Sequence, residues 1–288
     1  MNGDLVSIYV VTCNRVGLLK RCIDSIRKQK YANIEIIVVD DCSSDSTKEY
    51  LYSISNEDKR IKFFINDKNM GACHSRNIAI KNAQGKYITG CDDDDYFKEN
   101  RIDHFLKKHE LLDSYSFIYS SNIFDIGRKY KKSLPNKLSP KITSANDLLF
   151  YNSVGNQIFT KTELLRKYLF NESLPAWQDL ECWHRILLEE KSKALNVGGF
   201  TYIQDVAHEG NRISTSKLAK IDEARKIIIK NRDLSRVDGL ILMNHFRPYE
   251  NYKYIRMSSI KAMLLSKFTF FTIFLSFLYV IKFLKAKV

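Results

Sequence analysis

Apolar and polar residues alternate along residues 5–91 in a pattern that predicts strands and helices in turn. Runs of β-branched and aliphatic residues predict strands at 5–11, 34–39, 61–65 and 87–91. Between these runs, apolar residues recur at helical spacing, which predicts helices at 18–29, 46–54 (capped by Asp45 or Ser46) and 73–83. Strands that alternate with helices indicate βαβ units around a parallel sheet, and therefore an α/β fold.

The pattern changes beyond residue 105. We expect a helix at 104–112, a strand at 117–121, a basic polar segment at 128–141, a helix at 180–190, strands near 194 and 201, and helical structure at 218–247. The second half of the chain is therefore expected to be a mixed α+β region that continues the first.

Three polar segments stand where predicted strands end. They are Thr12–Arg15, Asp40–Asp45 and the four consecutive aspartates Asp92, Asp93, Asp94 and Asp95. In open sheets of parallel strands, ligands bind beyond the carboxyl ends of the strands. The sequence therefore predicts one site at this edge of the sheet, with acidic residues in two of its three loops.

The four aspartates constrain the chemistry of that site. Carboxylates this close repel one another by roughly 1 kcal/mol per pair in water. A solvated loop is the usual explanation of an acidic run, but this run follows an apolar strand and precedes Tyr96 and Phe97. Mg²⁺ or Mn²⁺ would stabilise such a cluster and take further ligands from a diphosphate. Because the chain has no GxxxxGK[ST] motif and no GxGxxG motif after the first strand, we expect a metal–diphosphate enzyme of another kind.

Composition and charge add two expectations. The net charge of +13 over 288 residues calls for a polyanionic partner. The six cysteines form no CxxC pair, and the N-terminal residues lack the basic region and long apolar run of a signal peptide, which favours a reduced cytoplasmic setting.

Five segments, in order, resemble a known family. They read VSIYVVTCNR, IEIIVVDDCSSDST, NMGACHSRNIAIKNAQGKYI, CDDDDYF and QDLECWHRI. Over about residues 5–215, the chain resembles glycosyltransferases of the GT-A fold in the inverting family 2. The resemblance implies a mostly parallel twisted sheet flanked by helices, with a nucleotide-sugar half at 1–100 and an acceptor half at 101–215.

The resemblance also implies roles for individual residues. Asp40 would contact the uracil ring, and Asp92 and Asp94 would be the two metal-binding acids of a DxD motif, with Asp92 also near the ribose. The remaining residues placed on the nucleotide-sugar are Val11, Thr12, Cys13, Arg15, Arg76, Asp93, His208 and Arg212.

Asp179 matches the family's catalytic base, the acid that removes the proton of the acceptor hydroxyl. The family usually has Glu-Asp here, whereas this chain has Gln178 before Asp179. Displacement at an anomeric carbon needs a base of this kind. The alternatives are that Asp179 is the N-cap of the following helix, which is compatible with the base role, and that Glu181 is the base.

The implied activity is a metal-dependent (Mn²⁺ or Mg²⁺) inverting transfer of a sugar from a UDP-sugar to a glycan, which forms a β-glycoside. The sugar would be a hexose such as glucose or galactose, or an N-acetylhexosamine. The pathway would be bacterial O-antigen, capsule or lipooligosaccharide assembly. The alternatives are a nucleotidyltransferase and a catalytically silent module that binds a membrane or nucleic acid. Nucleic acid is disfavoured because aromatic and basic residues do not interleave and the predicted site loops are acidic.

The last part of the chain predicts a membrane contact. Beyond a helical extension at 216–250, residues 251–288 are basic and contain an uncharged apolar run at 268–281. As a helix this run is about 21 Å long, which is short for a hydrocarbon core of about 30 Å. We therefore expect a helical tail that lies in an anionic membrane surface, with a buried core helix as the alternative. This places the enzyme at the cytoplasmic face of the inner membrane, near an undecaprenyl-diphosphate-linked acceptor.

Overall fold

The structure is a computed structural model that describes residues 3–127, 129–132, 138–207, 218–232, 234–243, 245, 257–266 and 269–285. The first half contains β1 (Val6–Thr12), α1 (Val16–Arg27), β2 (Ile34–Asp40), α2 (Thr47–Glu57), β3 (Ile61–Ile65), α3 (Ala72–Asn82), β4 (Tyr87–Asp92), β5 (Tyr96–Phe97), α4 (Arg101–Leu106) and the 3₁₀ helix η1 (His109–Asp113). Then follow β6 (Phe117–Tyr119), β7 (Asn122–Asp125), β8 (Tyr130–Lys132), β9 (Ile142–Thr143), α6 (Ala145–Phe150), β10 (Phe159–Lys161), α7 (Thr162–Tyr168), α8 (Gln178–Glu189), β11 (Ala194–Asn196) and β12 (Tyr202–Asp205). The last elements are α9 (Leu218–Asn231), α10 (Arg236–Leu242), α11 (Met257–Ser266) and α12 (Phe270–Lys285).

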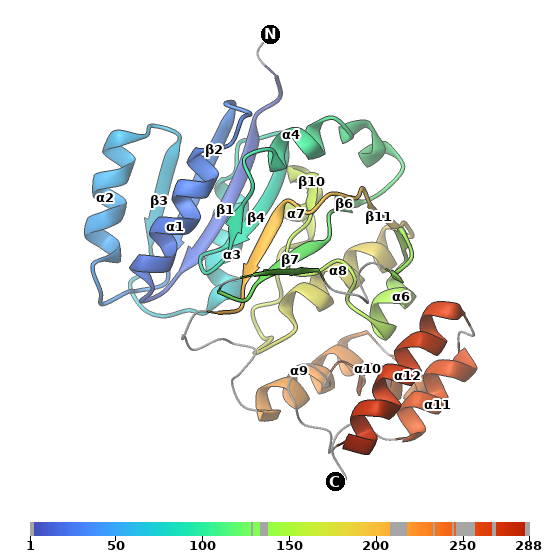
Figure 1. Ribbon diagram of the computed structural model, residues 1–288. Helices are drawn as coiled ribbons and strands as arrows, with labels where there is room; N and C mark the ends of the chain where they lie inside the picture. Colours follow the sequence, from blue (N-terminus) through green and yellow to red (C-terminus); the bar gives the residue numbers. More distant parts are fainter. Residues whose placement is uncertain are drawn as a thin grey trace.

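A central eight-stranded sheet has the order β3-β2-β1-β4-β10-β6-β11-β9 (Figure 1). The strands β3, β2, β1 and β4 are parallel, as predicted, whereas β10 is antiparallel to both β4 and β6. The sheet is thus an α/β sheet of the GT-A type, parallel in its first half and mixed in its second. The strand order reverses direction at β1, so the loops after β1 and β4 flank a topological switch point, where ligands of such sheets bind.

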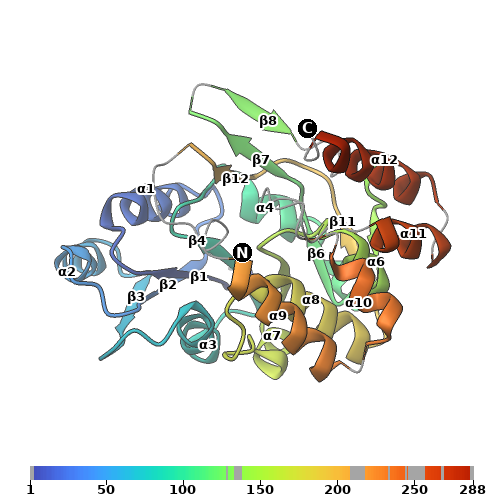
Figure 2. The ribbon, with the colours of Figure 1, turned by 90° about the horizontal axis from the view of Figure 1, so that it is seen from below.

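Side chains that alternate along the strands form two cores, one on each face of the sheet. Val6, Ile8 and Val10 pack with α1 and α2, whereas Tyr9 packs with α3 on the opposite face. Figure 2 shows α1 and α3 on opposite sides of the strands. All seven residues of β2 are buried, which explains why the sequence of a strand covered on both faces is an almost continuous apolar run.

Two helix boundaries differ from the predictions for local reasons. Helix α1 begins at Val16 because the Asp45 carboxylate accepts a hydrogen bond from the Val16 amide at 3.0 Å. The same carboxylate accepts from the Thr47 amide at the start of α2, at 3.1 Å. The prediction of one continuous helix at 104–112 is wrong. The chain forms two shorter helices there, α4 and the 3₁₀ helix η1.

A smaller four-stranded sheet, in the order β5-β12-β7-β8, packs beside the central one. Strand β5 follows directly after the four aspartates, and its Phe97 pairs with Tyr202 of β12. The aspartate loop is therefore held at both ends by strands, β4 before it and β5 after it.

The helices of the C-terminal region join the same core as α8. Ile221, Ile241, Met263, Leu275 and Tyr279 belong to one hydrophobic cluster with residues of α8. Within the part of the chain that the structure describes, no helix has the length and apolar character needed to cross a membrane. The domain boundaries at residues 215 and 250 stay a prediction, but the described residues of α9 to α12 share a core with α8 and do not form a detached tail.

Candidate active site

A cavity of about 1030 Å³ opens at the carboxyl ends of β1 and β4. Its walls come from the loop after β1, the start of α3, the four aspartates, the start of α8 and the end of β12. The lining residues on which the site depends are Val11, Thr12, Cys13, Arg15, Arg76, Asp92, Asp93, Asp94, Asp95, Asn156, Trp177, Gln178 and Asp179. Most of the predicted site residues, from both halves of the chain, therefore line one cavity.

The aspartate run brings three carboxylates together. Asp92, Asp94 and Asp95 each offer an oxygen atom, and these oxygens lie within 4.8 Å of one another. Asp92 and Asp94, the pair predicted to bind metal, are partly exposed, whereas Asp95 is buried. A set of carboxylate oxygens is the donor chemistry that Mg²⁺ and Mn²⁺ prefer, so these residues fit the predicted cation.

Asp93 turns away from this group and contacts Arg15. Two oxygens of Asp93 lie 2.6 and 3.0 Å from the Arg15 guanidinium, which also reaches Asp94 at 3.3 Å. Burial raises the pKa of Asp93 to about 7, and the Arg15 charge opposes that rise. The Arg15 charge therefore reduces the repulsion between Asp93 and Asp94.

Asp95 is fixed by residues from the second half of the chain. Its carboxylate accepts hydrogen bonds from the Tyr202 hydroxyl at 2.7 Å, the Asp205 amide at 3.0 Å and the Asn156 amide group at 3.1 Å. Burial and the neighbouring carboxylates Asp94 and Asp92 raise its pKa well above the usual range. Asp95 thus supports the aspartate loop from its buried side.

The sequence did not reveal the loop between α6 and β10, which carries side-chain amides into the site. Asn156 Nδ2 donates to Asp92 Oδ2 at 2.7 Å, and Gln157 Nε2 donates to Asp92 Oδ1 at 3.0 Å. Gln157 Oε1 in turn accepts from the Tyr9 hydroxyl at 3.0 Å. A side chain at Gly90 would collide with Gln157 and Tyr9, so a glycine in β4 permits this close approach. Single amide residues in a loop carry no sequence pattern that marks them as functional.

Asp179 lines the cavity from the first turn of α8. Helix α8 begins at Gln178, with Trp177 in the left-handed region (φ 54°) as its N-cap, so the N-cap alternative for Asp179 is wrong. Asn152 Nδ2 donates to Asp179 Oδ2 at 3.0 Å. Burial raises the pKa of Asp179, against the effect of a helix amide and Arg76. A partly buried carboxylate with a raised pKa, oriented by an amide, is suited to accept a proton.

The alternative base, Glu181, has a structural role. Its buried carboxylate lies 2.9 Å from Arg185 and 2.9 Å from Arg232, which directly follows α9, and it is not among the residues that line the cavity. Glu181 therefore ties the C-terminal region to α8.

Arg76 connects the two acidic parts of the cavity. Its guanidinium donates to Gln178 Oε1 at 2.7 Å and lies 3.4 Å from Asp92 Oδ1. Burial lowers the Arg76 pKa, but Asp92 and the neighbouring Cys73, Tyr9 and Asp179 together outweigh this effect and raise it. Gln178, which is neutral, thus accepts a hydrogen bond from Arg76 without pairing with its charge. Asp92 is the carboxylate that pairs with the Arg76 guanidinium.

Asp40 lies just behind the cavity wall. It is fully buried and does not line the cavity; its Oδ1 accepts from the Ser43 amide at 3.1 Å and from the Ser43 hydroxyl. Among the described residues, its buried Oδ2 has no hydrogen-bond partner. The neighbouring Asp41 carboxylate accepts from the amides of Met70 and Gly71 at 2.9 and 2.8 Å, and so shapes the adjacent loop. The uracil contact of Asp40 stays a prediction, as do the roles of His208 and Arg212, which lie outside the described residues.

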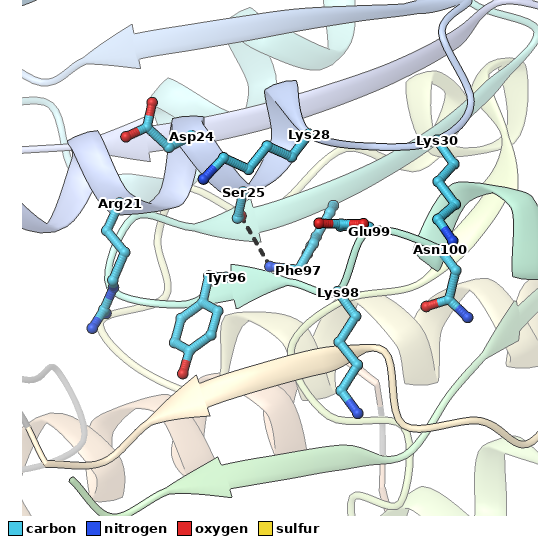
Figure 3. Close-up of a pocket in the computed structure, with 10 residues that line it drawn as sticks. All are labelled: Arg21, Asp24, Ser25, Lys28, Lys30, Tyr96, Phe97, Lys98, Glu99 and Asn100. Carbon is cyan, nitrogen blue, oxygen red and sulfur yellow. Dashed lines mark hydrogen bonds between the residues drawn. The ribbon is translucent and has the colours of Figure 1, made fainter.

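A second, more open hollow of about 760 Å³ lies beside α1 and β5 (Figure 3). The figure shows Arg21 and Tyr96 side by side, with the guanidinium 4.9 Å from the ring centroid. Arg21 donates to the Asp94 carbonyl oxygen and pairs with Asp205, so it supports the aspartate loop from the side of α1. The acidic residues that suit a cation line the larger cavity, which is therefore the candidate active site.

Comparison with known proteins gives a family and a fold. Residues 7–170 match the family described as Glycosyl transferase family 2. A relative from Escherichia coli (strain K12), named putative colanic acid biosynthesis glycosyl transferase WcaA, is 37% identical over 216 residues, which are 75% of this chain and 77% of the relative. A Campylobacter jejuni relative, named GalNAc(5)-diNAcBac-PP-undecaprenol beta-1,3-glucosyltransferase, is 31% identical over 172 residues, 58% of this chain and 55% of the relative.

Two solved structures share the fold. Residues 1–349 of S. aureus TarS in complex with UDP-GlcNAc superpose with a TM-score of 0.65 at 21% identity, covering 90% of this chain and 79% of that one. The mannosyltransferase PcManGT from Pyrobaculum calidifontis, in complex with GDP-Man and Mn²⁺, gives a TM-score of 0.56 at 16% identity, covering 96% of this chain and 79% of that one. The fold and the family are those that the sequence motifs resemble.

Proposed function

The chain belongs to glycosyl transferase family 2, and we propose that it transfers a sugar from a UDP-sugar to a hydroxyl group of a growing glycan, with inversion at the anomeric carbon. The observation that carries this proposal is the cavity itself. It is lined by a carboxylate cluster suited to a divalent cation, Asp92, Asp94 and Asp95, and by a separate carboxylate suited to be a base, Asp179.

The two carboxylate groups divide the work of a displacement reaction. Asp179, held by Asn152, takes the proton of the acceptor hydroxyl as that oxygen attacks the anomeric carbon. The bond between this carbon and the diphosphate oxygen breaks, and UDP leaves. An α-linked donor gives a β-glycoside by this single displacement.

Asp92 and Asp94 would hold Mn²⁺ or Mg²⁺, with Asp95 supporting their loop. The bound ion would supply positive charge to the departing diphosphate. Arg76 pairs with Asp92 and Arg15 pairs with Asp94, so positive charge also lies beside the proposed metal site. Val11, Thr12 and Cys13 line the part of the cavity where the nucleoside would bind, with Asp40 behind them.

Two features favour a lipid-linked glycan as the acceptor and polysaccharide assembly as the pathway. The relatives are named for colanic acid biosynthesis and for an undecaprenol-linked substrate. The basic, apolar C-terminal region suits the surface of a membrane. We therefore place the enzyme at the cytoplasmic face of the inner membrane, with a hexose or N-acetylhexosamine as the transferred sugar.

Release of UDP from a panel of UDP-sugars, in the presence of Mn²⁺ and of candidate glycan acceptors, tests the proposal. One donor should give UDP and a new β-glycoside together. If no UDP-sugar yields UDP with any acceptor, or if pyrophosphate is released instead, the proposal is wrong.

A further inference from the structure

In the part of the chain that the structure describes, helix α12 has one buried face and one exposed face of large apolar side chains. The covered face contains Thr272, Leu275, Ser276 and Tyr279, which are all buried. Leu275 and Tyr279 belong to the hydrophobic cluster that includes α8. The helix is therefore fixed on the catalytic region by its inner face.

The opposite face of α12 consists of large apolar side chains in contact with solvent. Phe270 is 74% exposed, Ile273 42% and Phe277 62%, and Leu265 at the end of α11 is 77% exposed. The spacing of three and four residues puts the first three side chains on one line along the helix. A helix that is apolar all round is normally buried all round, so this outer face indicates a partner that covers it.

The charge around this face indicates what the partner is. After Glu250 the chain has seven lysines and arginines and no acidic residue. Among the described ones, Lys261 of α11 is exposed. Two copies of so basic a region would repel each other, whereas an anionic lipid surface attracts it. The apolar face would enter the boundary between headgroups and acyl chains.

We propose that the outer face of α12, formed by Phe270, Ile273 and Phe277 together with Leu265 of α11, docks on an anionic lipid bilayer with α12 lying in the membrane plane. The sixteen residues of α12 give a helix about 24 Å long, shorter than the hydrocarbon core of about 30 Å. Figure 1 and Figure 2 both show α12 at the outer edge of the molecule, where a planar surface can reach it.

This surface lies close to the wall of the cavity that carries the base. On the inner side of α12, the Phe271 ring packs edge to face against Tyr151, with ring centroids 5.9 Å apart. Tyr151 directly precedes Asn152, which binds Asp179. Docking of this face would bring Asp179 near an acceptor anchored in the same membrane. This consequence rests on the proposed function, whereas the docking itself does not.

Vesicle binding by the full chain tests the surface without any donor or acceptor. The probes are vesicles of phosphatidylcholine alone and of phosphatidylcholine mixed with phosphatidylglycerol. The variant is Phe270→Ser combined with Phe277→Ser, and Tyr52→Ser on α2, which also removes an exposed aromatic ring, is the matched control. Substitution is preferable to truncation, because removal of α12 would also remove Leu275 and Tyr279 and expose the core residues that they cover.

The wild-type chain and the Tyr52→Ser control should bind the anionic vesicles, more weakly at high salt, and bind pure phosphatidylcholine less. The double variant should bind at least about tenfold more weakly, with an unchanged melting temperature because the altered side chains are exposed. Equal binding by the double variant, or no binding by the wild type, would overturn the inference. A third outcome would also overturn the inference: the wild type is a dimer, the double variant is a monomer, and both bind vesicles equally well. A second copy of the chain would then cover this face.

Transfer to a short soluble acceptor separates this inference from the proposed function. The double variant should keep wild-type transfer to that acceptor while it loses vesicle binding. Vesicle binding without any transfer by the wild type would leave the surface in place and contradict the proposed function.

Discussion

Asp92 is the last residue of β4, whereas Asn156, which donates a hydrogen bond to it, lies 64 residues later in an irregular loop. The same contrast holds across the cavity. The first half of the chain places its acidic groups at the ends of parallel strands, where the strand pattern itself marks them. The second half places amide side chains beside them through long-range folding. The two halves thus build one site by different means, and the predictions below test whether their contributions are separable.

The largest expected effect is loss of the metal-binding carboxylates. Asp94→Asn, or excess chelator on the wild type, should lower transfer by at least about 10³-fold, because a metal ion contributes several kcal/mol of charge stabilisation at the transition state. Re-added Mn²⁺ or Mg²⁺ should restore the chelated wild type but not the variant. Transfer assays are the measurement, with Glu163→Gln on the exposed side of α7 as a charge-matched control. Full transfer in excess chelator would contradict the assignment of the aspartate run as the site of a metal ion needed for transfer.

Asp179→Asn should slow transfer by about 10²–10⁴-fold, which is the range for loss of a general base. The wild-type kcat/KM should fall as the pH is lowered through the pKa of Asp179, because the base must be ionised, and burial places that pKa above the ordinary aspartate range. A pH profile of kcat/KM checks the second point. Wild-type turnover in the variant would show that the proton acceptor is a different group.

Both residues are indicated by the sequence, but in different ways: Asp179 through the family resemblance, and Asp94 through the strand pattern. Apolar strands with polar residues directly after them are local patterns, so Thr12, Asp40 and the aspartate run can be placed at one sheet edge before the structure is known. Their mutual arrangement is not local. The sequence alone does not predict that Asp93 pairs with Arg15 or that Asp95 accepts a hydrogen bond from Tyr202.

The second half shows where sequence reasoning ends. Asn152, Asn156 and Gln157 lie in a loop without periodicity, and their partners are distant along the chain. The helical extension and tail are predicted as helices, but their packing against α8 depends on the core that all of them share. Tertiary contacts of this kind leave no signature in a single sequence.

Asn156→Ala and Asn152→Ala form a pair that sharpens the contrast between the halves. Asn156→Ala should weaken metal and UDP binding about 10–100-fold, as expected when a residue that orients metal ligands is lost. Asn152→Ala should lower kcat while metal affinity stays unchanged, because Asn152 contacts only the base among these acids. Calorimetric metal titration and steady-state kinetics on both variants make the comparison.

Thermal melting is the control for this pair, since Asn156 also donates to Tyr202 and Asp95. If both variants lose metal affinity to the same extent, the amide loop acts as a single structural unit. The proposed division between the two asparagines would then be wrong.

The smallest effect is expected at Asp40. Asp40→Ala should raise the KM for the UDP-sugar about tenfold with a smaller change in kcat, because the residue is placed on the nucleobase and away from the reacting carbon. Ser43→Ala is the matched control, since it removes the hydroxyl that donates to Asp40 but leaves the carboxylate. An unchanged KM in Asp40→Ala would show that the Asp40 carboxylate does not bind the donor.

The most direct test of a site shared between the two halves is UDP binding, measured by calorimetry with and without Mn²⁺, in Asp94→Asn and Asp179→Asn. The account predicts that Asp179→Asn binds UDP with the metal dependence of the wild type although it is nearly inactive in transfer. Asp94→Asn should lose the metal-dependent part of UDP binding. If the wild type binds UDP equally well with and without Mn²⁺, or if Asp179→Asn fails to bind UDP while remaining folded, the division between a metal-bound donor and a separate base is contradicted.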